Sequence, residues 1–193
     1  MSELSKSQNE VFSLRKEKEE NIKASSLDSF PTSFKNSTNI NLIHQSHSKI
    51  EDGAKTDISV SVRGRILAIR SFGKLTFIDL SDDTGKIQLV LTTDLLSDEL
   101  QEYISNIDVG DIAGASGTVM KTKTGELSIE WKNFILLKKS FRNFPEKWPG
   151  LKDKETRFRQ RYLYLVVNEN SKESIQTQFR VQQIIRTFMQ SYK

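Results

Sequence analysis

An aromatic side chain and an amide side chain on neighbouring predicted strands are the residues of this chain best suited to ligand chemistry. Phe77 lies in the apolar run 75–80, and Gln88 lies in the run 86–91. If the aliphatic residues at every second position point inward, both side chains point outward. Any nucleobase can stack on an exposed ring, while an amide offers the edge of a base one donor and one acceptor group. The pattern predicts a surface that binds unpaired bases.

The inward phase of these two strands consists of aliphatic residues, namely Ile78, Leu80, Ile87, Leu89 and Leu91. The outward phase consists of Phe77, Asp79, Gln88 and Val90. A loop or a neighbouring helix that covers Phe77 would explain the same pattern, and the two explanations are equally compatible with it.

Five short apolar runs and one helix between residues 58 and 138 predict the fold. The runs are 58–67, 75–80, 86–91, 112–120 and 127–137. Gly64 offers a place for a bend or bulge, and Gly85 closes a polar turn in which it can take a positive φ. Ser97 can cap a helix that Gly110 ends. The order βββαββ is that of the OB-fold, so we predict a mainly β, five-stranded barrel with one inserted helix.

In this fold, strands two and three and the loops 1–2 and 4–5 form the surface that binds oligonucleotides. Arg70 and Glu126 fall in these two loops and are candidates to complete the site. On position alone, each fits a solvated surface charge equally well.

Composition narrows the classes of function. The chain has 193 residues, of which 36% are hydrophobic, and no apolar run approaches the roughly 18–20 residues that cross a bilayer. The absence of cysteine excludes disulfides, thiol catalysis and cysteine-ligated zinc. His44 and His47 lie in a polar stretch without a cluster of ligating residues, so no metal site is expected. The N-terminus lacks a secretory or organelle-import pattern, and we expect a cytoplasmic protein.

The net charge of +4 is unevenly distributed. Basic and acidic residues number 8 and 9 in residues 1–59, 9 and 11 in residues 60–138, and 12 and 5 in residues 139–193. A protein that binds single strands without selectivity relies on a basic groove along the phosphates. The slightly acidic barrel therefore favours selective contacts with a few bases.

The segments outside the barrel set the predicted boundaries. Residues 1–57 should form a surface helix over 8–23 and a flexible extended connector, and residues 58–138 the barrel. Residues 139–170 should form an irregular, basic hinge, and residues 171–193 a helix. The apolar stripe of this helix has no partner in the chain, which suggests that the polypeptide continues or dimerises there.

The hinge contains the basic run Arg157, Arg159 and Arg161, interleaved with Phe158 and Tyr162. Such a run can contact the phosphates of a nucleic acid or pair with acidic residues across a protein interface. The pattern favours neither contact over the other.

Residues 150–165, followed by Asn168, are the most specific stretch of the chain, and they resemble the hinge of class II lysyl-tRNA synthetases. The segments 121–129 and Gly110–Asp111, and Gly73–Lys74 followed by Phe77, resemble the barrel of that family. The resemblance to the N-terminal part of these enzymes extends over nearly the whole chain. Aspartyl- and asparaginyl-tRNA synthetases share the barrel, but their hinges are less similar. One departure is Tyr164, where the family usually has aspartate.

The resemblance implies that the barrel binds the anticodon loop of a lysine-specific tRNA, and not DNA or a membrane. Phe77 would stack on an anticodon base, Gln88 and Glu126 would bind the central uridine, and Arg70 would contact the loop. This role agrees with the outward phase of Phe77 and Gln88. The resemblance also implies that the complete enzyme is a homodimer.

The resemblance further implies a lysine–tRNA ligase that uses ATP and Mg²⁺. Residues 1–193 contain none of the three class II catalytic motifs, and residues 171–193 would be the first helix of the catalytic domain. We therefore expect no catalytic residue, cofactor site or aminoacylation activity in these 193 residues. Two alternatives are a stand-alone OB-fold RNA-binding or regulatory protein and an assembly module that dimerises through its terminal helix.

Overall fold

The computed structural model describes residues 3–27, 29–93, 96–142 and 153–192. The chain forms two compact units, Met1–Asn143 and Phe144–Lys193. The N-terminal segment and the strands belong to the same first unit, since side chains of both contribute to one apolar core.

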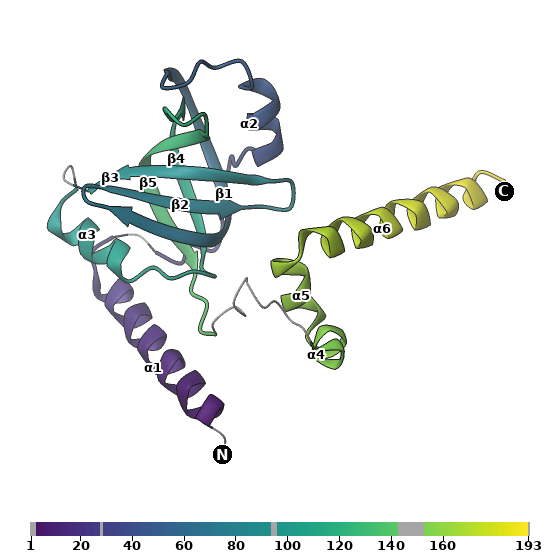
Figure 1. Cartoon of the computed structure of the whole chain (residues 1–193), viewed down its shortest axis with the longest axis horizontal. Coiled ribbons are helices and arrows are strands. Elements are labelled where there is room, and N and C mark those ends of the chain that lie inside the picture. The colour runs from purple at the N-terminus through teal and green to yellow at the C-terminus, as the bar shows by residue number, and fades with distance from the viewer. Residues whose placement is uncertain (1–2, 28, 94–95, 143–152, 193) are drawn as a thin grey trace. The chain divides into compact units, whose positions relative to one another are not determined.

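Five strands of the first unit close a barrel in the order β1-β2-β3-β5-β4 (Figure 1). The strands are β1 (Lys55–Phe72), β2 (Leu75–Ser81), β3 (Lys86–Thr92), β4 (Ile112–Lys121) and β5 (Leu127–Lys138). Neighbouring strands are antiparallel, except for the parallel pair β3 and β5. The predicted OB-fold is confirmed, although β1 extends five residues beyond the predicted end at Leu67.

The period-two alternation of β2 and β3 matches the structure. The five residues predicted to point inward are at most 3% exposed. Val90 departs from the simple pattern, because it lies on the outward phase but is only 8% exposed. Its neighbours across the ladders are Phe77 on β2 and Glu130 on β5, which flank this small side chain on both sides.

Helix α3 (Asp98–Ser105) follows the predicted cap, since the Ser97 hydroxyl accepts a hydrogen bond from the Leu100 amide at 3.3 Å. The helix ends at Ser105, five residues before Gly110, which instead takes a φ of +103° in the loop before β4. The predicted end was therefore wrong, because the glycine serves a loop and not the helix.

Two other glycines also act differently from the prediction. The register of β1 shifts between Ile66 and Ala68 and between Lys55 and Ser59, and not at Gly64. A Cβ atom at Gly64 would come within 2.4 Å of the Ser81 carbonyl oxygen. Gly85 has no positive φ. The Asp82 carboxylate orders that turn by accepting hydrogen bonds from the amides of Thr84 and Gly85. Gly64, which has no Cβ atom, thus permits a close approach of β1 and the end of β2.

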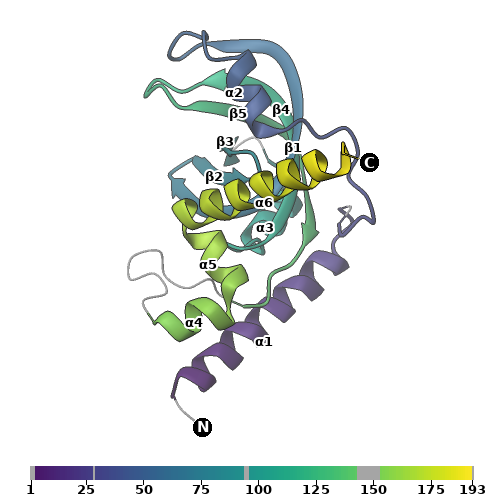
Figure 2. The ribbon, with the colours of Figure 1, turned by 90° about the vertical axis from the view of Figure 1, so that its right-hand side faces the viewer.

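The segment before the barrel is better packed than the sequence predicts. Helix α1 (Glu3–Ala24) and helix α2 (Ile40–Ser46) lie at opposite ends of the barrel (Figures 1 and 2). Ile22, Ile40 and Ile43 are at most 1% exposed and belong to the core. The predicted flexible connector was wrong in this part, because two isoleucines one helical turn apart close an end of the barrel.

A buried charge cluster ties α1 to the end of β5. Lys139 is fully buried, and its ammonium group donates to the Asn106 carbonyl oxygen, to Asp108 and to Asp111, at 2.6–2.8 Å. Lys18 of α1 reaches the other oxygen of Asp108 at 2.7 Å. The sequence analysis missed this cluster, because its members are far apart in the chain.

The second unit consists of α4 (Lys154–Arg159), α5 (Arg161–Val167) and α6 (Glu169–Gln190). Most of residues 153–170 of the predicted irregular hinge are thus helical, whereas residues 139–142 belong to the first unit and form no helix. Pro145, Pro149 and Gly150 lie outside the described residues. The side chain of Asn168 caps α6, accepting from the Ser171 amide at 3.0 Å. This helix starts two residues before the predicted start, because asparagine caps it in place of Ser171.

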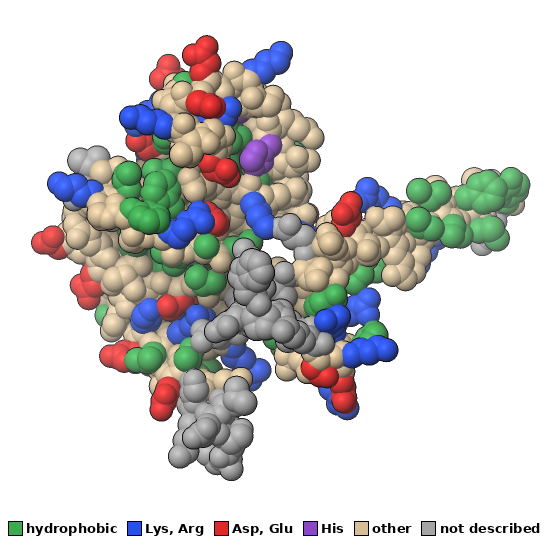
Figure 3. Space-filling model, in the orientation of Figure 1, with side chains coloured by type: hydrophobic (Ala, Val, Ile, Leu, Met, Phe, Trp, Pro, Cys, Tyr) green, Lys and Arg blue, Asp and Glu red, His purple; other side chains and the backbone are tan. Residues whose placement is uncertain are grey.

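Apolar side chains gather along the C-terminal half of α6 (Figure 3). Seven of them are 49–75% exposed: Phe179, Val181, Ile184, Ile185, Phe188, Met189 and Tyr192. No helix in the described part of the chain is both long and apolar enough to cross a membrane.

Candidate nucleic-acid interface

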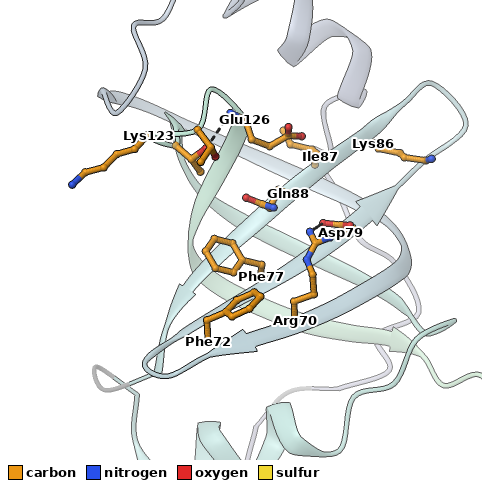
Figure 4. Close-up of a pocket in the computed structure, with 11 residues that line it drawn as sticks. Arg70, Phe72, Phe77, Asp79, Lys86, Ile87, Gln88, Lys123 and Glu126 are labelled. Carbon is orange, nitrogen blue, oxygen red and sulfur yellow. Dashed lines mark hydrogen bonds and ion pairs between the residues drawn. The ribbon is translucent and has the colours of Figure 1, made fainter.

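An open groove of about 640 Å³ lies on the outer face of β1, β2 and β3 and extends to the β4–β5 hairpin (Figure 4). All four barrel residues predicted as site residues line it: Arg70, Phe77, Gln88 and Glu126. The other lining residues are Phe72, Asp79, Lys86, Ile87, Thr122, Lys123 and Thr124. The structure therefore brings together residues that are up to 56 positions apart in the sequence.

The register of the sheet explains why these side chains share one face. Arg70 pairs with Phe77 across β1 and β2, and Asp79 pairs with Gln88 across β2 and β3. Residues paired directly across a ladder point to the same side of the sheet, as do residues two apart on one strand. Two rows of side chains thus lie side by side on the floor of the groove.

Two phenylalanine rings form the apolar part of this floor. Phe77 is partly buried, whereas Phe72 at the end of β1 is 66% exposed. The ring centroids are 6.1 Å apart and the ring planes are inclined by 64°, in an edge-to-face arrangement. The sequence analysis missed Phe72, because the predicted strand stopped at Leu67.

The amide of Gln88 is held by a second residue that the sequence analysis missed. The hydroxyl of Ser128, which is fully buried on β5, can donate to Oε1 of Gln88 or to the Glu126 carbonyl oxygen, each at 3.2 Å. Within the described residues, no group of the protein accepts a hydrogen bond from the Gln88 Nε2 atom. The amide is thus fixed at its oxygen and presents its N–H donors to a ligand.

Glu126 follows the β4–β5 turn, and backbone hydrogen bonds hold it in place. Its amide donates to the Thr122 hydroxyl at 3.0 Å, and its carbonyl oxygen accepts from the Thr122 amide at 2.9 Å. Lys121 pairs with Asp52 at 2.8 Å and so braces this hairpin against the segment before β1. In the described part of the chain, the Glu126 carboxylate itself has no ion pair or hydrogen bond.

Arg70 is paired and not free. Its Nη2 atom donates to Oδ1 of Asp79 at 2.6 Å, and both side chains are partly exposed. Lys86 and Lys123 extend away from the groove at opposite sides (Figure 4). The groove therefore combines rings, an amide and a carboxylate on its floor with cations at its rim.

The three arginines of the basic run belong to the second unit. Arg157 lies over the ring of Tyr164 at 5.4 Å, and Arg159 pairs with Glu155 at 2.8 Å. Tyr164, at the position where the resemblance leads us to expect aspartate, therefore contacts Arg157 through a cation–π interaction. Arg161 is exposed.

In the described residues, no group of three or more His, Cys, Asp or Glu side chains could hold a metal ion. The carboxylates of Asp108 and Asp111 are engaged by Lys139 and lie in the first unit away from the groove-lining set. The rings, the amide and the carboxylate that line the groove are groups suited to stacking and hydrogen bonding.

Comparison with known proteins supports this interpretation. Residues 60–137 match the family model of the OB-fold nucleic acid binding domain of the tRNA anticodon type. Lysine–tRNA ligase of Magnetococcus marinus is 38% identical over 185 residues, and that of Edwardsiella ictaluri is 41% identical over 163 residues. The chain is homologous to lysine–tRNA ligases. Its barrel corresponds to an OB-fold nucleic acid binding domain.

The two matches differ greatly in how much of each protein they cover. They include 95% and 83% of this chain, but only 37% and 32% of the two lysine–tRNA ligases. Lysine–tRNA ligase of Thioalkalivibrio sulfidiphilus, which is 43% identical, is covered to a similar extent, 32%. The chain thus spans about a third of the length of the curated relatives it matches and corresponds to their N-terminal part.

Proposed function

We propose that the groove binds the anticodon loop of a lysine-specific tRNA and that Phe77, Gln88, Glu126 and Arg70 make the contacts. One observation carries this proposal: the sheet and the β4–β5 hairpin bring all four side chains to one groove, in a chain homologous to lysine–tRNA ligases. Phe77 stacks on a base, which any nucleobase permits. Selectivity must therefore come from the polar groups around the ring.

The two polar groups complement the edge of uracil. Uracil presents an N3–H donor between two carbonyl oxygens. The Glu126 carboxylate can only accept hydrogen bonds, so it accepts from N3–H, and the Gln88 amide donates to a carbonyl oxygen. Cytosine has an unprotonated acceptor nitrogen at the same position, which leaves the carboxylate without a partner. The pair therefore selects uridine over cytidine at the middle anticodon position.

The charge of the first unit supports selective binding. Residues 1–143 contain 19 basic and 20 acidic residues, and the two kinds are interspersed over the face shown in Figure 3. Such a surface attracts phosphates weakly. Affinity then depends on a few well-placed contacts with bases.

A substitution that inverts the hydrogen bonding of Glu126 tests the proposal. Glu126→Gln keeps the shape of the side chain but adds an N–H donor that can satisfy the cytosine nitrogen. The preference for a lysine anticodon stem-loop over one with cytidine in the middle position should fall by about 1.5–3 kcal/mol, the usual range for a hydrogen bond to a charged group. Gln88→Ala should reduce the same preference. Fluorescence anisotropy titrations of both RNAs measure it.

Lys123→Ala is the matched control, because Lys123 extends from the same hairpin at the rim of the groove. This substitution should weaken binding to both RNAs equally and reduce the dependence of affinity on salt. Unchanged uridine preference in both Glu126→Gln and Gln88→Ala would contradict the proposal.

We further propose that the complete protein is a cytoplasmic, homodimeric lysine–tRNA ligase, with the barrel at 58–138, the hinge at 139–170 and the start of the catalytic domain at 171–193. ATP and Mg²⁺ would serve the complete ligase, and residues 1–193 contain none of the three class II catalytic motifs that would bind them. The purified 193-residue chain should therefore show no lysine-dependent exchange of pyrophosphate into ATP. Exchange above a buffer control would refute this part of the proposal.

A further inference from the structure

We propose that Phe72 is a second stacking platform, which holds the nucleotide adjacent to the one stacked on Phe77. This inference rests on the proposed function of the groove and extends it by one base. Phe72 lines the same groove as Phe77, yet 66% of its surface is exposed. A ring so exposed contributes little to the core, so its burial does not explain its presence at this position.

The hairpin that carries Phe72 is tight and well braced. Phe72 pairs directly with Leu75, and Gly73 takes a φ of +57° in the two-residue turn between them. Thr93 of the neighbouring chain segment binds the Lys74 carbonyl oxygen through its amide at 2.8 Å and through its hydroxyl at 3.0 Å. The backbone that carries the ring is therefore held in place before a ligand arrives, which lowers the entropic cost of binding.

The angle between the two rings means that they must stack on different bases. Planes inclined by 64° cannot both lie parallel to one nucleobase. A centroid distance of 6.1 Å places the two rings within reach of consecutive nucleotides of one strand. Proteins that bind single strands commonly stack successive bases on successive aromatic side chains.

Binding of anticodon stem-loops to the full chain tests the inference. Phe72→Ala should weaken binding to the lysine anticodon stem-loop by about 5- to 100-fold, the range expected for loss of one stack. Phe72→Leu should weaken it similarly, because leucine retains apolar area but no flat ring, whereas Phe72→Trp should retain binding. Ile58→Ala is the matched control, because Ile58 is a half-exposed apolar residue of the same strand that does not line the groove, and it should change affinity by less than about twofold.

Abasic substitutions identify the stacked nucleotide. Removal of the base on one side of the middle anticodon position should weaken binding to the unsubstituted protein but have no further effect on Phe72→Ala. The inference would be overturned if Phe72→Ala bound the stem-loop with unchanged affinity. It would also be overturned if removal of the base on each of the two sides weakened binding to Phe72→Ala by as much as it weakens binding to the unsubstituted protein. Failure of the proposed function gives a different result, in which Phe77→Ala also binds normally and uridine is not preferred.

Discussion

Phe77 and Leu89 lie on adjacent strands, one residue out of register, and point to opposite faces of the sheet. Phe77→Ala should weaken binding to the anticodon stem-loop by about 1–3 kcal/mol, since one stack is lost, and should barely change the melting temperature. Leu89→Ala should do the opposite, because a cavity in the core costs about 2–5 kcal/mol of unfolding free energy. Calorimetry and RNA titration of both variants measure the two effects.

If Phe77→Ala unfolded the barrel while the folded fraction still bound RNA with full affinity, the ring would serve the fold and not the ligand. This outcome has to be tested, because the edge-to-face contact with Phe72 gives Phe77 a packing partner on the solvent-exposed face of the sheet.

Period-two alternation was sufficient to predict the phase of Phe77 and Gln88, because β2 and β3 are regular and their inward residues are aliphatic. It was insufficient for Ser128, a polar residue that is fully buried on β5. The role of Ser128 arises from a parallel pairing of β3 with β5 that brings it opposite Gln88. A contact between strands 40 residues apart leaves no local signal in the sequence.

At the scale of elements, the cluster around Asp108 joins α1 to the barrel. Burial by itself raises the pKa of this carboxyl, but hydrogen bonds and charge from Lys139 and Lys18 outweigh it and hold the pKa below its ordinary value. A folded-state pKa below the unfolded value of about 4 means that the ionised carboxylate stabilises the fold fully above that pH. The contribution is lost as pH falls through the folded pKa.

Asp108→Asn should therefore lower the unfolding free energy at pH 7 by about 1.5–3 kcal/mol, the range for hydrogen bonds to charged groups. At a pH below the folded-state pKa the difference from the parent should shrink, because the parent carboxyl is then also neutral. Urea denaturation at pH 7 and under strongly acidic conditions measures both values. Asp57→Asn, on an exposed part of β1, should change the unfolding free energy at neither pH. If the loss of stability caused by Asp108→Asn were the same at both pH values, the stabilising role of the ionised Asp108 carboxylate would be contradicted.

The elements outside the barrel show where local patterns are insufficient. The N-cap of α3 and the strand alternation are local, so the sequence predicts them. Ile40 and Ile43 stand in a polar, proline-containing stretch, and only the open end of the barrel gives their short helix a partner. The helices of the hinge were missed for a related reason, since the charged run around Arg157 has no apolar periodicity.

At the scale of the whole molecule, the exposed apolar stripe of α6 should drive self-association of the 193-residue chain. At about 25 cal/mol per Å², a few hundred Å² of apolar surface is worth several kcal/mol. Sedimentation velocity should show a mass that rises with concentration. Ile184→Glu combined with Phe188→Glu, one helical turn apart in the stripe, should abolish the rise, whereas Gln190→Glu, whose neighbours one turn earlier are Arg186 and Thr187, should not.

A concentration-independent monomer for the unsubstituted chain would contradict this expectation and would mean that the stripe is covered within one molecule. Association that survives the double substitution would place the contact elsewhere.

The hydrogen bonds of Arg15 have a consequence for how the chain is made. This side chain of α1 donates to the carbonyl oxygens of Ser140 and Arg142, which follow it by 125 and 127 residues. A ribosome adds about 5–20 residues per second, so α1 leaves the exit tunnel about 6–25 s before its partners leave it. During that interval the helix has no barrel to pack against, and a factor that binds nascent chains can contact it before the barrel is complete.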